Sequence, residues 1–177
     1  MRLASASERQ ERESLQIRIN ELSDQNSKLD QEEKLLDYRE QNARAGYVYV
    51  ISNIGAFGEG VFKIGMTRRL EPMERVDELG DASVPFRFDV HALVFSDDAP
   101  TLEAKLHARF SAGRLNEING RKEFFRADLK EIEQVIRANY DAVVEVIHTA
   151  SAEQYRESLL LRKMIAAETK GPEVVNL

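Results

Sequence analysis

The sequence contains no cysteine among its 177 residues and no long run of apolar residues. The absence of cysteine excludes disulfide bonds, thiolate zinc sites and a cysteine nucleophile, so any metal must be held by oxygen or imidazole ligands. A membrane-spanning helix needs roughly 18 or more consecutive apolar residues, and the N-terminal stretch MRLASASERQERESLQ lacks the apolar centre of a signal peptide. We therefore expect a soluble protein that is not exported.

Positive charge is also in short supply, because 25 Lys and Arg residues face 31 Asp and Glu residues, for a formal net charge of −6. A protein that coats nucleic acid nonspecifically needs a basic surface, since its affinity comes from displacing counterions from phosphates. The balance varies along the chain, and residues 46–127 carry 11 basic and 12 acidic side chains. This segment therefore permits a local basic face.

Residues 8–42 contain neither glycine nor proline and are rich in Glu, Gln, Arg and Leu, which predicts one long helix. One set of positions in it has the alternating spacing of four and three that is typical of a two-stranded coiled coil. These positions are Leu15, Ile19, Leu22, Asn26, Leu29, Glu33 and Leu36. Asn26 falls at an a position of the heptad, where a buried asparagine favours dimers. We therefore expect a homodimer through this helix. The alternative is a helix that docks one face on the following domain.

After residue 46, strand-like and helix-like segments follow one another. The predicted strands are residues 47–53, 61–66 and 86–96. The predicted helices are 72–80, 97–110, 126–140 with the cap Asp128, and one from about Ser151. This order predicts an α+β fold with a central antiparallel sheet flanked by helices. We divide the chain into an N-terminal helix at 1–45, a domain at 46–150, and a C-terminal helix with a loose tail at 151–177.

Four short motifs in the domain resemble a known family. YVYVI, and after a turn KIGMT, resemble the paired strand motifs of the GIY-YIG endonuclease superfamily. LEAKLHARF and GRKEFF resemble its phage-type branch, which includes the meiotically up-regulated gene 113 proteins. The resemblance covers roughly residues 46–127. It implies a cytoplasmic endonuclease that cleaves phosphodiester bonds with Mg²⁺ or Mn²⁺.

The resemblance also implies catalytic roles for three residues. Tyr49 matches the tyrosine that helps to deprotonate the attacking water, although a phenol with a pKa of about 10 is a weak base unless a cation favours its anion. Lys63 stands where the second motif usually carries tyrosine, and is the candidate for that cation. Arg75 matches the arginine that contacts the scissile phosphate, a role that suits a planar guanidinium.

Glu103 matches the family's metal-binding glutamate, and hard cations such as Mg²⁺ prefer carboxylate oxygen. His107 lies four residues later, hence on the same helix face, and is a candidate for proton transfer or phosphate binding. Taken alone, the two residues are as well explained as a surface pair without metal. Likewise Tyr49 alone suits a core position, Lys63 alone a solvated charge, and Arg75 alone a surface charge that pairs with Glu71 or Glu78. The prediction therefore depends on all of them meeting in one place.

A second group of residues is predicted to contact nucleic acid. Its members are Tyr47, Thr67, Arg68, Arg69, Arg114 and Lys122. Packing is the alternative for Tyr47, and solvated charge the alternative for Lys122. In the GRKEFF motif, Glu123 is expected to pair with Arg114, and the two phenylalanines are expected to fill the core.

The leading functional prediction is therefore a metal-dependent endonuclease that acts on DNA in a phage or bacterial defence, repair or recombination setting. One alternative is an inactive nucleic-acid-binding module, motivated by Lys63 in a tyrosine's place. Another is a structural dimerisation protein. A shared open cleft that contains Tyr49, Lys63, Arg75 and Glu103 favours the enzyme, whereas burial or dispersal of these residues favours the alternatives.

Overall fold

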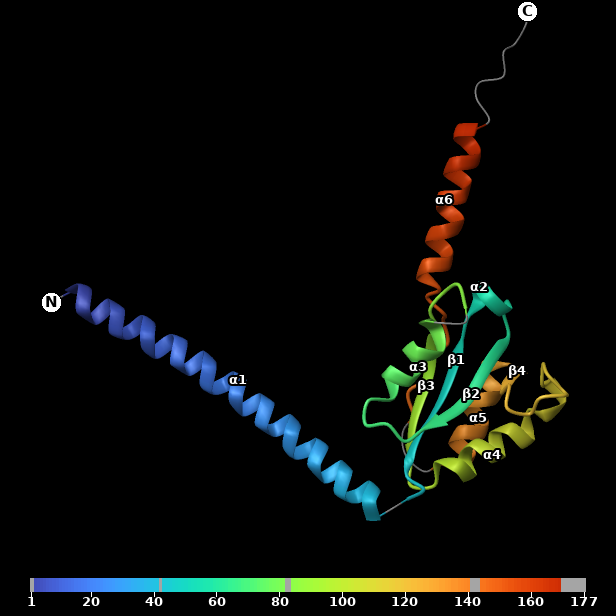
Figure 1. The fold of residues 1–177 in the computed structure, drawn as a ribbon, viewed down its shortest axis with the longest axis horizontal. Helices are drawn as coiled ribbons and strands as arrows, with labels where there is room; N and C mark the ends of the chain where they lie inside the picture. Colours follow the sequence, from blue (N-terminus) through green and yellow to red (C-terminus); the bar gives the residue numbers. More distant parts are fainter. Residues whose placement is uncertain (1, 42, 82–83, 141–143, 170–177) are drawn as a thin grey trace, which may run out of the picture. The chain divides into compact units, whose positions relative to one another are not determined.

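The computed structural model describes residues 2–41, 43–81, 84–140 and 144–169, so the tail predicted at residues 170–177 lies outside the described residues. The chain divides into two compact units, Met1–Ala43 and Arg44–Leu177. The second unit has the predicted α+β architecture, with a four-stranded antiparallel sheet and flanking helices (Figure 1). Within the described residues, no helix combines the length and apolar character that crossing a membrane requires.

The first unit is helix α1 (Arg2–Gln41), which confirms the predicted N-terminal helix. Its predicted coiled-coil positions carry an apolar stripe that is 45–60% exposed in the single chain. The stripe consists of Leu15, Ile19, Leu22, Leu29 and Leu36. Leucine and isoleucine side chains gain about 1.5–3 kcal/mol when fully buried, so a partner surface would stabilise this helix.

The sheet contains β1 (Gly46–Ser52), β2 (Val61–Thr67), β3 (Asp89–Ser96) and β4 (Phe124–Arg126), in the order β3-β1-β2-β4. The three predicted strands are confirmed, with β3 beginning three residues later than expected. The sequence did not indicate β4, because a strand of three residues is too short to show alternation. The connection between β1 and β2 contains one short helix, α2 (Ile54–Phe57), whose first turn is capped by the Asn53 side chain.

Helix α3 (Pro72–Asp81) covers one face of the sheet, and α4 (Ala99–Arg109) and α5 (Leu129–Asn139) cover the other (Figure 1). This division follows from the alternation of side chains along a strand. In β1, Val48 and Val50 pack into the core beneath α4 and α5, whereas Tyr49 and Ile51 pack toward Val76 of α3. The position of Tyr49 matters for function, because its ring lies on the face of the sheet that α3 covers.

The C-terminal helix α6 (Glu153–Thr169) begins close to its predicted start, and the segment before it runs along β3. Ile147 donates its N–H to the carbonyl of His91 in β3 at 2.8 Å. The buried His91 ring lies 2.6 Å from the Ile147 carbonyl through Nδ1 and 2.8 Å from the Ser52 hydroxyl through Nε2. Both ring nitrogens are thus satisfied, so His91 joins the C-terminal segment to the sheet.

Candidate active site

The site lies where the pairing between strands β2 and β4 ends. Strand β4 pairs only with the first three residues of β2, so later backbone groups need other partners. Ile64 donates its N–H to the Glu123 carbonyl at 3.2 Å, and its own carbonyl lies 2.9 Å from Nε2 of His107. Glu103 accepts a hydrogen bond from the N–H of Met66. The unpaired edge of β2 therefore holds both predicted functional residues of α4 in place.

A cleft of about 810 Å³ opens beside this edge. Tyr49 and Lys63 line it from the sheet, and Arg75 and Glu103 line it from helices α3 and α4. These four residues are spread over 55 positions of the sequence, yet they face one open space. A phenol, an ammonium, a guanidinium and a carboxylate around one cleft have the composition of a site that could bind and cleave a phosphodiester.

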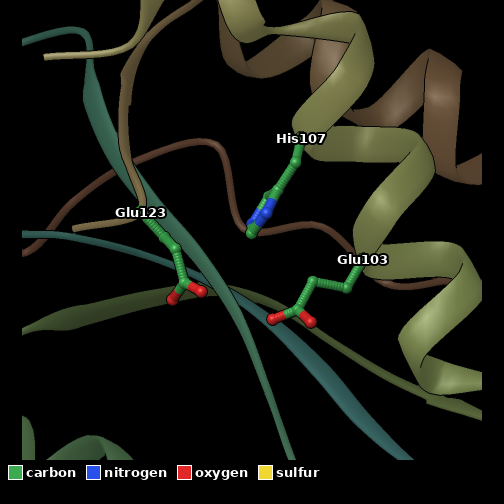
Figure 2. A group of neighbouring side chains, drawn as sticks. All are labelled: Glu103, His107 and Glu123. Carbon is green, nitrogen blue, oxygen red and sulfur yellow. The ribbon is translucent and has the colours of Figure 1, made fainter. Parts of the chain in front are cut away.

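A cluster of possible metal ligands lies at this site (Figure 2). Glu103 and His107 point from successive turns of α4 toward Glu123, which precedes β4 (Figure 2). One ligand atom from each of the three residues lies within 4.8 Å of the other two. Two carboxylates and an imidazole suit Mg²⁺ or Mn²⁺ better than a soft metal.

Burial raises the pKa of the Glu103 carboxyl to about 7, and the negative charge of Glu123 adds to the increase. The cations and dipoles around Glu103 offset only part of this effect, since Lys63 and the Met66 N–H act in the opposite direction. A carboxyl with this pKa is about half protonated at neutral pH. A divalent cation would favour the ionised form, so metal binding and proton release are expected to be coupled.

Tyr49 is almost completely buried, and this burial raises the pKa of its phenol to about 12. Arg75 acts against the increase through its charge and a side-chain hydrogen bond to the phenol. The cation beside Tyr49 is thus Arg75, whereas the sequence suggested Lys63 for that position. At neutral pH the phenol is protonated, which suits it to hydrogen bonding rather than to acting as a base by itself.

The glycine of the KIGMT motif gives the Tyr49 ring its space. Gly65 lies directly opposite Tyr49 in the β1–β2 ladder. A Cβ atom on Gly65 would lie 2.5 Å from the phenol oxygen and 2.7 Å from Cζ of the ring. Both distances are shorter than carbon contacts allow, so any larger residue must displace the ring.

We therefore expect Gly65→Ala to disturb the site and to lower the free energy of unfolding by about 1–3 kcal/mol, the usual cost of overpacking. Chemical denaturation measures the stability, and cleavage assays measure the effect on Tyr49. Gly120→Ala is the matched control, because its Cβ would meet nothing within 4 Å. Equal stability of the two variants would show that Tyr49 does not need this space.

The buried ammonium of Lys63 lies 2.9 Å from the Glu123 carboxylate. The expected pairing of Glu123 with Arg114 is therefore wrong. Arg114 instead stacks over the Phe125 ring at 4.9 Å and donates to the carbonyl of Gly120. Lys63 pairs with Glu123 because Lys63 lies on β2, the strand next to β4, and Glu123 directly precedes β4. The GRKEFF motif contains Glu123, but the motif alone did not indicate a metal ligand at this position.

The residues predicted to contact nucleic acid have different surroundings. Lys122 is exposed and lines the cleft, as does its neighbour Arg121. Arg68 is exposed beyond the end of β2. Tyr47 packs edge-on against Phe95 at 5.2 Å, which supports the packing alternative.

Two other predicted contacts are engaged within the protein. Thr67 is buried, and its hydroxyl accepts the N–H of Arg69 at 3.2 Å, so this hydroxyl stabilises the turn after β2. Arg69 forms a two-pronged ion pair with Glu78 of α3 and thereby lowers the pKa of that carboxyl. An arginine held in this way would have to exchange partners before it could bind phosphate.

Residues 46–139 form a domain of a nuclease-type fold. Residues 46–139 match the family model of the T5orf172 domain, which covers more than half of the chain, and the chain belongs to this family. No curated protein and no solved structure gave a significant match. The matched segment extends from β1 to the end of α5 and so contains every residue of the cleft discussed above.

Proposed function

We propose that this chain is a metal-dependent endonuclease of the GIY-YIG type that hydrolyses phosphodiester bonds in DNA. The supporting observation is that Tyr49, Lys63, Arg75 and Glu103 line one open cleft. The proposed setting is defence, repair or recombination in a phage or a bacterium. A binding surface alone does not require two partly buried carboxylates, Glu103 and Glu123, close together in its cleft, so this observation favours the enzyme over an inactive binding module.

In this proposal, the residues of the cleft divide the work between positioning and charge stabilisation. Arg75 binds the scissile phosphate and stabilises the negative charge that develops there. The Tyr49 phenol, oriented by Arg75, accepts a hydrogen bond from the attacking water and helps to direct it in line with the leaving oxygen. Lys63 keeps Glu123 in position through their ion pair.

The donor set fits a divalent cation, with Glu103 as the principal ligand and Glu123 and His107 as additional ligands. Such a cation supplies Lewis-acid activation and lowers the pKa of bound water. Because Nε2 of His107 is engaged with the Ile64 carbonyl, Nδ1 is the ring atom we assign to the ligand set. Glu123 has to share its carboxylate between Lys63 and the cation.

Supercoiled plasmid gives a direct test of the proposal. The purified protein is expected to convert it to nicked or linear forms with Mn²⁺ or Mg²⁺, and to leave it intact with a chelator. A protein that binds DNA but cuts neither DNA nor RNA at any metal concentration would instead be the binding module.

The raised pKa of Glu103 predicts that metal affinity depends on pH. Below pH 7 the carboxyl holds a proton that the metal must displace, so Mn²⁺ affinity should fall as the pH falls from 8 to 6, approaching tenfold per unit at the acid end. Calorimetric titration at several pH values measures this dependence. Glu123→Gln should move the midpoint to lower pH, because it removes a neighbouring negative charge. An affinity for Mn²⁺ that does not change between pH 6 and pH 8 would contradict the prediction.

We also propose that α1 forms a parallel dimer with a second copy of the chain. The exposed apolar stripe and Asn26 at a core position support this assignment. Leu29→Asp is expected to convert the dimer to monomers in sedimentation experiments, because it places a charge in the seam. Gln31→Asp, an equal change on the outer side of the same helix, should leave the dimer intact. A wild-type protein that sediments as a monomer would exclude this arrangement.

A further inference from the structure

Residues 115–122, here called the rim loop, lie beside the cleft between the short helix η1 (Ser111–Gly113) and β4 (Figure 1). The base of the loop is closed by a hydrogen bond from the N–H of Leu115 to the carbonyl of Phe124 at 2.9 Å. Within it, Asn116 accepts the N–H of Ile118 at 3.1 Å. Arg114 donates to the carbonyl of Gly120 in the loop at 3.0 Å. The rim loop thus has a defined shape that is held by its own contacts.

The tip of the rim loop carries an aliphatic side chain in full contact with water. Ile118 is 99% exposed, whereas the other large exposed hydrophobic residues that the structure describes between α1 and α6 are 42–54% exposed. Single apolar residues on a surface are common and need no partner. Ile118 differs from these because an ordered loop holds it out beside a cleft.

The charges around Ile118 suit a polyanion. Arg121 and Lys122 follow it in the rim loop and line the cleft together with Asn116. Glu117 is the one acidic residue of the loop sequence. The loop therefore presents an isoleucine next to two cations, and those cations adjoin the residues proposed to bind the scissile phosphate.

We propose that the rim loop binds the minor groove of duplex DNA and that Ile118 wedges against a base step, while Arg121 and Lys122 bind flanking phosphates. This inference rests on the proposed function and specifies its substrate as a duplex that is kinked near the cut. Isoleucine is among the residues that unstack base steps in this way, and the bend allows more of the DNA to contact the protein. Such a wedge favours flexible pyrimidine–purine steps, so it would also contribute sequence preference.

Short DNA duplexes that carry 2-aminopurine at successive positions test the wedge, because the fluorescence of this base increases when it is unstacked. The experiment uses the full chain in a Glu103→Gln background, so that the DNA remains intact. We expect one or two positions to brighten on binding. Ile118→Ala should abolish the increase and weaken binding by about tenfold, the size expected when buried aliphatic carbons are removed. The folding of this variant is not at risk, since the side chain touches solvent only.

Ile147→Ala is the matched control, because it removes another exposed isoleucine of the domain that is absent from the cleft lining. It should bind and brighten the DNA like the parent. Binding without brightening at any position, or brightening that survives Ile118→Ala, would overturn the wedge and leave the nuclease proposal standing. A parent protein that binds no duplex would overturn both. A change in the sedimentation of the DNA-free protein caused by Ile118→Ala would assign the tip to a protein contact instead.

Discussion

Glu103→Gln is expected to reduce metal-dependent DNA cleavage by a factor of about a thousand or more, the scale of losing a principal source of electrostatic stabilisation. The substitution keeps the size of the side chain and its capacity to accept the Met66 N–H, but it removes the negative charge. The remaining candidates, Glu123 and His107, are already engaged with Lys63 and the Ile64 carbonyl. They are therefore poorly placed to replace it.

Two measurements separate this outcome from misfolding. Thermal unfolding of Glu103→Gln should match or exceed that of the parent, because burying a neutral amide costs less than burying a carboxylate next to Glu123. Mn²⁺ titration should show weakened binding, while binding of duplex DNA is retained. Glu131→Gln, on the exposed surface of α5, provides a control with the same chemistry. If Glu103→Gln cut plasmid at the parent rate, the metal site would have to be placed elsewhere.

The elements predicted correctly from sequence are those whose hydrophobic repeat continues over many residues or whose ends carry a clear capping or proline signal. The four-three spacing of α1 continues over several turns, and Pro72 and Asp128 mark helix starts that the structure reproduces. Strand β4 was not predicted because its three residues owe their conformation to pairing with β2, and the paired residues, from Lys63↔Phe124 to Val61↔Arg126, are 61 to 65 positions apart in the sequence. Local propensity carries no information about such a partner.

The candidate site could be predicted only in part for a similar reason. Residue types and motif positions were enough to single out the four residues that line the cleft. The sequence did not reveal which of these side chains form ion pairs or hydrogen bonds with one another. Whether Lys63 meets Tyr49 or Glu123 depends on which strand lies next to β2, and Thr67 is buried because the chain turns directly after it. The space that Gly65 leaves for the Tyr49 ring became apparent only from the cross-strand register.

Arg75→Ala is expected to lower the cleavage rate by about a hundredfold to a thousandfold, the usual cost of removing one donor that stabilises transition-state charge. Its guanidinium lines the cleft, is less than half exposed, and hydrogen bonds to the Tyr49 phenol. It also donates to Glu78 at 3.2 Å, a single contact that leaves other N–H groups of the guanidinium for a phosphate. Arg75→Lys should restore only a small part of the rate, because an ammonium lacks the planar fork that can contact the phenol and a phosphate oxygen together. The effect should appear mainly in kcat, since the developing charge exists only in the transition state.

A second readout distinguishes this role from a structural one. Arg75 opposes the increase in the pKa of Tyr49, so Arg75→Ala should raise that pKa further, which a spectroscopic titration of the phenol can follow. Comparison with a Tyr49→Phe background isolates this tyrosine from the others. Arg87→Ala, which removes an exposed arginine outside the cleft lining, should change neither quantity. If Arg75→Ala raised the pKa of Tyr49 but cut DNA at the parent rate, Arg75 would only support the tyrosine, and Lys122 or Arg121 would become the candidates for binding the scissile phosphate.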